Sequence, residues 1–401
     1  MPPPFLPYGR QVIDDDDVAA VAEVLRGDFL TTGPTVDAFE AAFTAAVDAP
    51  HAVACSSGTA GLHLAMLALG VGPGDVVVVP TVTFLASANC AAYVGADVAF
   101  ADVDPDTGLM TVAHAEAAAA RAGRERVKAI VAVHLNGHCV DVAALADAFP
   151  GVPVVEDACH ALGGSMRARD QGWHKVGAVP DSAIAMFSTH PVKTIATGEG
   201  GVLTTRDPEL DERMRRYRNH GMVRDPARFT DTARAFDSSG APNPWYYEMP
   251  EPGFNYRLSD IHAALGLRQI GKLDRFVAAR RSLRARYAGR LAGLGPHVRP
   301  LPVAEGCEPA WHLSVALIDF DALGIERAAA MNRLRERRIG TQVHYIPVHG
   351  QPWFRANHPT PDLPGAEAYY ARCLSLPLFP GMTEADVDRV VDALGEVLGA
   401  G

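Results

Sequence analysis

The sequence predicts an α/β fold in which a mainly parallel sheet is covered by helices on both faces. From about residue 50, short β-branched runs alternate with Ala- and Leu-rich stretches of helical pattern. This alternation produces repeated strand–helix–strand units, which build parallel sheets. The length of 401 residues is enough for two domains of about 100–200 residues each.

The first expected element is a helix that begins at the acidic run 14–17 and continues through Val18, Val21 and Leu25. Carboxylates are favourable at a helix N-terminus, and we expect these four to form a solvated cap. Seven strands are expected next, at 52–54, 76–79, 98–101, 129–133, 154–156, 184–187 and 201–203. Ligands of such sheets bind beyond the carboxyl ends of the strands, so the loops after these runs are the expected place of a site.

The second half begins with a long stretch rich in Pro, Gly and Ser, at 223–257. A loop of this length in a compact domain usually has a function, and we interpret it as a functional or intersubunit loop. Ser259 then begins a helix expected to run to about Leu294 and to bridge two domains. A strand at 313–318, a helix at 326–337, a strand at 341–346 and a last helix from Thr383 follow. The predicted domains are therefore 1–270 and 271–401.

Charge and hydropathy exclude two classes of partner. With 36 Lys and Arg against 47 Asp and Glu, the net charge is −11, which does not favour binding to nucleic acid or to an anionic membrane. The uncharged segment 76–96 is long enough to span a bilayer, but Pro80 and Gly95 are among the residues that interrupt it. We interpret it as a buried strand followed by a loop and a helix.

The chain start and the cysteines indicate a cytoplasmic location. The first residues, Met-Pro-Pro-Pro-Phe, lack the basic and apolar regions of a secretory signal. The six cysteines form no CxxC pair, which is typical of reduced, buried thiols. A metal site could be imagined from His134, His138, Cys139, Cys159 and His160, but because Asn136-Gly137 interrupts a helical spacing we expect none.

The run Ser56-Ser57-Gly58-Thr59 follows the first predicted strand and precedes a helical stretch. A turn of small residues at a helix N-terminus offers bare backbone N–H groups and hydroxyls, which together can bind phosphate. Many such turns are rich in Gly and Ser for conformational reasons only. This motif alone therefore leaves phosphate binding open.

Asp157 and Lys193 follow two further strands. Asp157 lies at the carboxyl end of a strand, where a carboxylate needs a salt bridge, a helix N-terminus or a protonated ring nitrogen as partner. Lys193 lies among small and apolar residues, which disfavour the ammonium and would make it a nucleophile, unless it is an ordinary solvated lysine. Together with the phosphate turn and Ser188, they are the parts of a pyridoxal phosphate site.

The ordered set of motifs resembles the DegT/DnrJ/StrS family of sugar aminotransferases. The resemblance extends over nearly the whole chain. It is carried by Leu30 to Pro34, Ser57 to Thr59, Pro80 to Phe84, Glu156 to Gly163, Phe187 to Lys193, Gly198 to Gly201, Asn219 to Met222, Gly253 to Arg257 and His344 to Pro347. It implies the fold of type I pyridoxal phosphate transferases, which is aspartate aminotransferase-like, with a large α/β/α domain and a small C-terminal α/β domain.

The resemblance also implies roles for individual residues. Lys193 would hold pyridoxal 5'-phosphate as a Schiff base and move the proton, and Asp157 would pair with the pyridinium nitrogen. Phe84 would stack on the cofactor ring, and His160 would lie near its phenolic oxygen.

The cofactor phosphate would be held from both subunits of a homodimer. In this chain Gly58, Thr59 and Ser188 would bind it, and Asn255 would reach the phosphate of the neighbouring subunit. L-Glutamate would be the amino donor.

Within the family, the run Phe187 to Lys193 is similar to the subgroup of pseudaminic acid biosynthesis, which aminates C4 of a UDP-linked 4-keto-6-deoxy-N-acetylhexosamine. By the same likeness the sugar nucleotide would be lined by Tyr8, Phe29, Leu30, Thr31, Thr32, Gln342, Val343, His344 and Tyr345. Two alternatives stay open. The substrate could be another nucleotide keto sugar, such as a GDP-4-keto or a dTDP-3- or 4-keto sugar, or the protein could bind the cofactor without catalysis and serve regulation.

Overall fold

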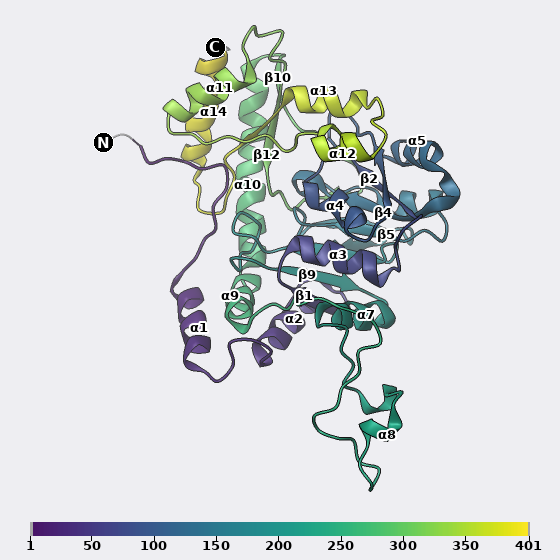
Figure 1. Cartoon of the computed structure of the whole chain (residues 1–401). Helices are drawn as coiled ribbons and strands as arrows, with labels where there is room; N and C mark the ends of the chain where they lie inside the picture. The colour runs from purple at the N-terminus through teal and green to yellow at the C-terminus, as the bar shows by residue number, and fades with distance from the viewer. Residues whose placement is uncertain (1–2, 400–401) are drawn as a thin grey trace.

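The computed structural model describes residues 3–399 and is built around one seven-stranded sheet (Figure 1). The strand order is β1 (His51–Cys55), β9 (Gly201–Thr205), β8 (Ile184–Ser188), β5 (Val154–Asp157), β4 (Val127–Val133), β2 (Val76–Pro80), β3 (Asp97–Ala101). Only β9 runs antiparallel to its neighbours, and the other adjacent pairs are parallel. The predicted mainly parallel sheet is confirmed, and each of the seven expected strands lies within a different strand of this sheet.

The residues of these strands are buried because helices pack against the sheet. In β2, Val76, Val77, Val78 and Val79 are all fully buried, the continuous apolar run expected of a strand covered on both faces. The helices of this region are α2 (Pro34–Val47), α3 (Gly58–Ala68), α4 (Leu85–Tyr93), α5 (Val112–Ala122), α6 (Val142–Ala148) and α7 (Pro208–Arg218). Segment 76–96 thus contains β2, a short loop and the whole of α4, as predicted. Within residues 3–399, every helix is too short or too polar to cross a lipid bilayer.

The first helix is confirmed, but its acidic cap is only partly solvated. Helix α1 (Asp15–Arg26) has Asp14 as its N-cap and packs along α9 (Asp260–Ile270). Asp17 is fully buried, and its carboxylate lies 2.8 Å from the Lys272 ammonium. The prediction of four solvated carboxylates was wrong for Asp17, because a residue 255 positions away supplies its partner.

The single helix predicted from Ser259 to Leu294 is in fact two helices. Ser259 caps α9 as expected, but the chain turns at 271–272, and α10 (Leu273–Leu291) begins afterwards, followed by the short 3-10 turn η4 (Ala292–Leu294). Gly271 is a weak helix former, and the Lys272 side chain is held by Asp14 and Asp17. These features end the first helix.

The C-terminal region forms a small antiparallel sheet packed with helices. Its order is β10 (Val298–Pro300), β12 (Ser314–Ile318), β13 (Cys373–Leu376). The helices here are α11 (Arg327–Glu336), α12 (Pro352–Asn357), α13 (Pro364–Arg372) and α14 (Glu384–Leu398). The expected strand at 313–318 and the helices from 326 and from Thr383 are therefore confirmed. A third small sheet joins β11 (Cys307–Glu308), β6 (Ser165–Arg167) and β7 (Trp173–Lys175).

The strand predicted at 341–346 was wrong. This segment makes a single bridge, in which the backbones of Gln342 and Ser375 exchange hydrogen bonds of 3.1 and 2.8 Å. Beyond this bridge the contact to β13 is made by a side chain, since His344 Nδ1 lies 2.8 Å from the Ser375 hydroxyl, and Pro347 has no N–H to donate to a ladder.

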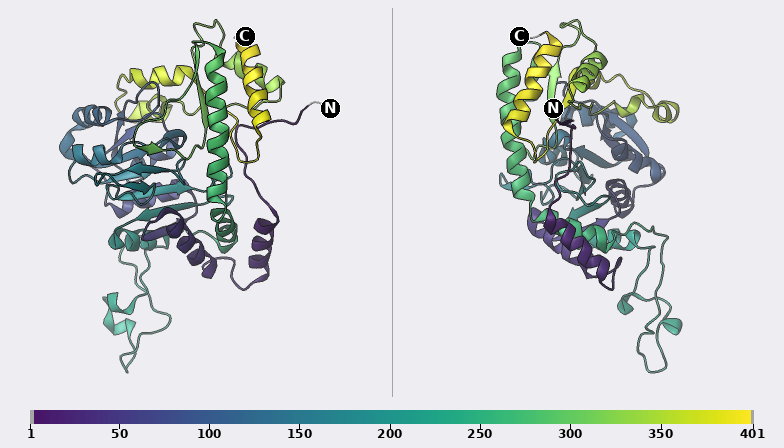
Figure 2. Two further views of the ribbon diagram at one scale, coloured as in Figure 1. Left: turned by 180° about the vertical axis from the view of Figure 1, so that it is seen from behind. Right: turned by 90° about the vertical axis from the view of Figure 1, so that its left-hand side faces the viewer.

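Two hydrophobic clusters hold the molecule together. The larger surrounds the seven-stranded sheet, and the smaller lies among α10, α11, α14 and the C-terminal sheet. Helix α10 contributes Phe276 to the first and Tyr287 to the second, and Figure 2 shows it running along both regions. The division of the chain at residue 270 stays a prediction. All six cysteines are free thiols, of which only Cys159 is not fully buried.

The long loop after α7 forms an arm that projects from the body (Figures 1 and 2). It contains the short helices η3 (Pro226–Arg228) and α8 (Thr232–Ala235). The ring of Phe229 packs against the rings of Phe236 and Tyr246, with centroids 6.1 and 4.9 Å apart. The arm is thus ordered by its own contacts. Its predicted functional or intersubunit role stays a prediction.

Candidate active site

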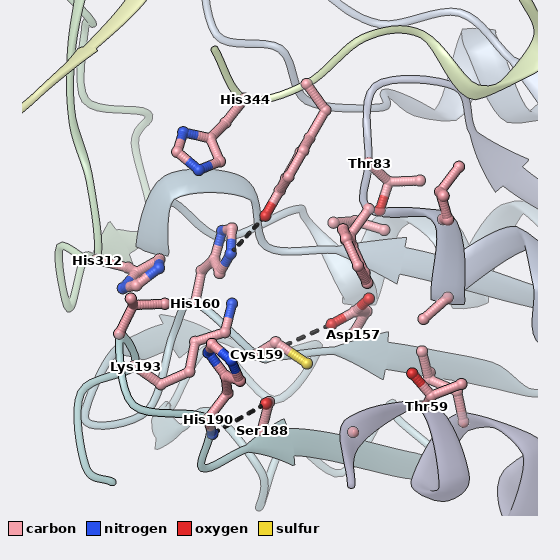
Figure 3. A pocket seen from close by; sticks show the side chains of 18 of the residues that line it. Thr59, Thr83, Asp157, Cys159, His160, Ser188, His190, Lys193, His312 and His344 are labelled. Atoms are coloured by element: carbon pink, nitrogen blue, oxygen red, sulfur yellow. Dashed lines mark hydrogen bonds between the residues drawn. The ribbon is translucent and has the colours of Figure 1, made fainter. Parts of the chain in front are cut away.

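A cavity of about 570 Å³ opens at the carboxyl ends of β1, β4, β5 and β8 (Figure 3). Twelve of the predicted site residues line it: Tyr8, Gly58, Thr59, Phe84, Asp157, His160, Ser188, Lys193, Gln342, Val343, His344 and Tyr345. They come from segments that are more than 300 residues apart in the sequence. The predicted position of the site, at the carboxyl edge of the sheet, agrees with this cavity.

Asp157 is the last residue of β5, and its carboxylate is held by neutral donors. The Ser87 hydroxyl donates to Oδ2 at 2.5 Å, and the Cys159 backbone N–H donates to Oδ1 at 3.2 Å. Only 6% of Asp157 is exposed. The carboxylate therefore has a fixed orientation at the edge of the cavity and free lone pairs for a further donor.

Lys193 lies in the loop after β8, and its amine points into the cavity (Figure 3). Burial by the surrounding protein lowers its pKa, and the Arg280 guanidinium lowers it further, while the nearby Cys159 and Asp157 side chains oppose the shift. A lowered pKa favours the neutral amine, which is the nucleophilic form. The environment therefore suits an amine that attacks a carbonyl.

The turn after β1 forms an anion cradle at the N-terminus of α3. Ser57 caps this helix by accepting from the Ala60 N–H at 3.1 Å, and Gly58 and Thr59 form its first turn. A Cβ at Gly58 would lie 3.1 Å from the Ser188 Cβ, so glycine keeps this space open beside the Ser188 hydroxyl. Backbone N–H groups at a helix N-terminus, together with the hydroxyls of Thr59 and Ser188, suit a phosphate.

His160 is oriented by two hydrogen bonds. Its Nδ1 accepts from the Asn136 N–H at 3.2 Å, and its Nε2 lies 3.2 Å from the Tyr345 hydroxyl. Burial, Lys193 and His344 hold the His160 pKa well below its usual range, so the ring is neutral. Because Nδ1 accepts, Nε2 carries the proton and donates to Tyr345, which leaves the Tyr345 hydroxyl hydrogen free for a ligand.

The opposite side of the cavity comes from Tyr8 and residues 342–346. The rings of Tyr8 and His344 have centroids 5.5 Å apart, and Tyr345 lies against Phe84 at 5.9 Å. Burial and the Lys193 charge lower the pKa of His344 to about 3, so this imidazole is neutral. Phe84 is 55% exposed at the mouth, where a ring could stack on it.

Five predicted site residues do not line this cavity. Phe29 and Leu30 are exposed, Thr31 bridges Ser259, and Thr32 borders a separate cavity of about 420 Å³. Asn255 is exposed and bridges Asn219. Within one chain these residues cannot act at the cavity around Lys193.

Several lining residues were missed from the sequence. They are Leu62, Thr83, Leu85, Ala86, Val133, Cys159, His190, Val192, Glu199, His312, Ile346 and Gln351, whereas Ser57, which also lines the cavity, belongs to the predicted phosphate turn. His312 packs on His160 with ring centroids 4.3 Å apart, yet nothing near it in the sequence signals a site. For Thr83 and Ser87 a signal existed, since both are hydroxyls in an otherwise apolar buried segment.

His134 and Cys139, two of the residues at which no metal site was expected, have other partners. His134 Nε2 lies 2.8 Å from Glu156, and its Nδ1 accepts from the Val140 N–H. Cys139 N–H donates to the Cys307 sulfur. Among residues 3–399, no group of three or more His, Cys, Asp or Glu side chains is arranged to hold a metal ion.

Comparison with solved structures identifies similar folds. An aminotransferase TlmJ from Streptoalloteichus hindustanus is 30% identical, with a TM-score of 0.85 over 98% of this chain and 99% of that chain. PseC of Helicobacter pylori, an aminotransferase involved in pseudaminic acid biosynthesis, is 26% identical, with a TM-score of 0.86 over 99% and 100%. DesV of S. venezuelae, in complex with a ketimine intermediate, is 32% identical, with a TM-score of 0.83 over 99% of both chains.

Fold and site together define an aminotransferase of the aspartate aminotransferase-like type, and the predicted fold class is confirmed. The sequence model of the DegT/DnrJ/EryC1/StrS aminotransferase family matches residues 11–395. The chain belongs to this family.

Proposed function

We propose that this protein is a pyridoxal 5'-phosphate-dependent sugar aminotransferase whose catalytic lysine is Lys193. One observation carries the proposal: a single cavity collects a desolvated amine, an oriented carboxylate and an anion cradle. These are the three groups that this cofactor requires. Binding of this one cofactor explains why all three groups lie at the same edge of the sheet.

The residues present fit the cofactor. Gly58, Thr59 and Ser188 would hold its phosphate, since a side chain at Gly58 would fill the cradle. Asp157 would accept a hydrogen bond from the protonated ring nitrogen, and Phe84 would cover one face of the ring. When bound, the cofactor supplies an electron-withdrawing ring that allows an amino group to be exchanged for a carbonyl oxygen.

The overall exchange needs no oxidant or reductant. L-Glutamate gives up its amino group and one hydrogen from Cα and becomes 2-oxoglutarate. The carbonyl carbon of the sugar receives an amino group and a hydrogen and becomes an amine-bearing CH. The carbonyl oxygen of the sugar leaves as water, and a water supplies the 2-oxo oxygen of 2-oxoglutarate. Lys193, as a neutral amine beside both reacting carbons, would move the proton between them.

The substrate that we propose is a UDP-linked 4-keto-6-deoxy-N-acetylhexosamine, aminated at C4 as in pseudaminic acid biosynthesis. The TM-score of 0.86 to PseC over nearly the whole of both chains supports this choice. Tyr8 and residues 342–345 would line the sugar.

Another nucleotide keto sugar is the second candidate. TlmJ and DesV, at 30% and 32% identity, are more similar in sequence than PseC at 26%. A GDP-4-keto sugar or a dTDP-3- or 4-keto sugar is therefore included in the test below.

We further propose a homodimer in which each chain completes the site of its partner. Phe29 to Thr32 and Asn255 lie away from the cavity of their own chain, and Phe29 and Leu30 expose apolar side chains. This supports the role predicted for Asn255 at a partner's cofactor phosphate, and we extend it to Phe29 to Thr32, which would line the sugar bound by the partner. The predicted cytoplasmic location remains a prediction.

The first test is an absorption spectrum of the purified protein with pyridoxal 5'-phosphate, before and after L-glutamate. A visible band that forms on binding and is replaced by a near-ultraviolet band on adding glutamate is expected. A panel of UDP-, GDP- and dTDP-linked keto sugars, with product analysis, then identifies the acceptor. Cofactor binding with no amine transfer to any acceptor would instead indicate a regulatory protein, and absence of the visible band would contradict the assignment of Lys193.

A further inference from the structure

We propose that Ser87, supported by Thr83, is a positioning residue that holds Asp157 in the orientation needed to pair with the cofactor ring nitrogen. This inference rests on the proposed function, and it assigns a role to two residues that have none above: Thr83, which lies within the motif Pro80 to Phe84, and Ser87, which lies outside every motif. Thr83 lies in the loop after β2, next to Phe84, and Ser87 lies in the first turn of α4.

The geometry is a short buried chain of hydroxyls. Ser87 Oγ donates to Asp157 Oδ2 at 2.5 Å, and Thr83 Oγ1 lies 2.7 Å from Ser87 Oγ. Ser87 is 0% and Thr83 1% exposed, so water does not compete for these bonds. The chain ends at Asp157, the carboxylate that we propose to pair with the cofactor ring nitrogen.

The direction of the chain follows from counting hydrogens. A serine hydroxyl has one hydrogen, and Ser87 gives it to Asp157. Thr83 must therefore donate to Ser87, which polarises the Ser87 hydroxyl and strengthens its bond to the carboxylate. The chain thus presents a charge-assisted hydrogen-bond donor to the Asp157 carboxylate.

The second oxygen of Asp157 is held separately. Its partner is the Cys159 backbone N–H, which a side-chain substitution does not remove. With both oxygens held, the carboxylate has little freedom to rotate. Loss of Ser87 would leave one anchor and would allow the plane of the carboxylate to turn away from the ring nitrogen.

Four titratable side chains lie near Asp157 and bear on any pH measurement. Burial raises the pKa of Cys90 to about 12, and it raises those of Cys159 and Tyr345 well above their usual ranges. These three are neutral near neutral pH. Lys193, whose pKa is lowered, is the one expected to change charge when the cofactor binds.

The test compares Ser87→Ala with Thr204→Val, a control that removes another buried hydroxyl. Thr204 is 0% exposed and donates to the Gly177 carbonyl at 2.7 Å on β9, away from Asp157. We expect Ser87→Ala to lower kcat about 10- to 100-fold, as the loss of a hydrogen bond to a charged group does. The KM for glutamate should change less, and Thr204→Val should leave kcat near the wild-type value.

A spectroscopic readout separates positioning from stability. A positive charge on the ring nitrogen would repel a proton at the lysine-bound end of the cofactor. Weaker pairing with Asp157 would reduce that positive charge, so the proton would be lost at higher pH. The pH midpoint of the cofactor's visible absorption change should therefore rise. We expect a rise of about one pH unit for Ser87→Ala. Thr83→Val should shift the midpoint in the same direction by less, and Thr83→Ser, which keeps the hydroxyl, should restore it.

The wild-type spectrum, measured in parallel, distinguishes failure of the proposed role of Ser87 from failure of the proposed function. A normal wild-type band with an unchanged midpoint and kcat in Ser87→Ala overturns the role of Ser87 alone. If Ser87→Ala does not fold, an unchanged midpoint in Thr83→Val overturns it. Absence of a cofactor band in the wild type overturns the proposed function and this inference together.

Discussion

The two sides of the cavity differ in how the chain builds them. The sheet wall, made of Gly58, Thr59, Asp157, Ser188 and Lys193, lies on or directly after strands of one rigid sheet. The covering wall, made of Tyr8 and residues 342–346, is irregular backbone with one bridge to β13 and side-chain contacts to Ser375 and His160. A rigid sheet edge suits groups whose positions the reaction fixes, and irregular segments suit recognition of a variable sugar.

This difference predicts that substitutions in the sheet wall stop the chemistry, whereas those in the covering wall change substrate affinity. The largest effect is expected for Lys193→Ala. Without an amine to bind the cofactor and move the proton, kcat should fall by at least about 10⁴-fold. Amine transfer from glutamate, followed by product analysis, measures it.

Lys193→Arg is the matched control, because it keeps a positive charge but stays protonated and cannot act as a nucleophile. It should be as inactive as Lys193→Ala and should lack the visible cofactor band. Activity within tenfold of wild type in either variant would contradict the role of Lys193.

Asp157→Asn should have the second largest effect. The amide has the size of the carboxylate but no charge to stabilise a protonated ring nitrogen, so kcat should fall about 100- to 1000-fold. Cofactor binding should persist, since the phosphate cradle is separate. A single-turnover measurement with glutamate checks this, and a loss limited to cofactor affinity would argue against an electronic role.

The sheet wall was predictable from sequence because its residues lie in local strand–turn–helix units. Each motif, such as Gly58-Thr59 after β1, is read within a few residues of its strand. The residues of the covering wall were predicted only from the family resemblance, and the backbone of 341–346 was wrongly predicted as a strand. The contact of His344 with Ser375 spans 31 residues, and no local pattern indicates it. The same reason explains the missed burial of Asp17, whose partner Lys272 is distant in sequence.

The covering wall should show a smaller effect of a different kind. Gln342 is exposed, and its Oε1 accepts from the Val343 N–H at 2.9 Å, so its amide N–H₂ is available to a ligand. Gln342→Ala should raise the KM for the keto sugar about tenfold, the usual cost of one polar contact. The glutamate half-reaction should change less. Equal loss in both half-reactions would contradict the division between the two walls.

The smallest expected effect concerns pH, and it also separates the walls. His344, with a pKa of about 3, and His160, with a pKa well below its usual range, stay neutral near neutral pH. The KM for the sugar should therefore be nearly constant from about pH 6 to 8, where an ordinary histidine titrates. Lys193 must instead lose a proton to act, and its pKa is lowered by burial and by Arg280.

Cofactor capture by the cofactor-free protein should thus speed up as the pH rises and level off below about pH 10.4, the ordinary value of lysine. The negative charge of Asp157 raises the pKa of Lys193, so Asp157→Asn should move the midpoint to lower pH. Stopped-flow absorbance at a series of pH values measures both midpoints. A midpoint at or above that of free lysine would mean that the sheet wall does not prepare its amine for reaction.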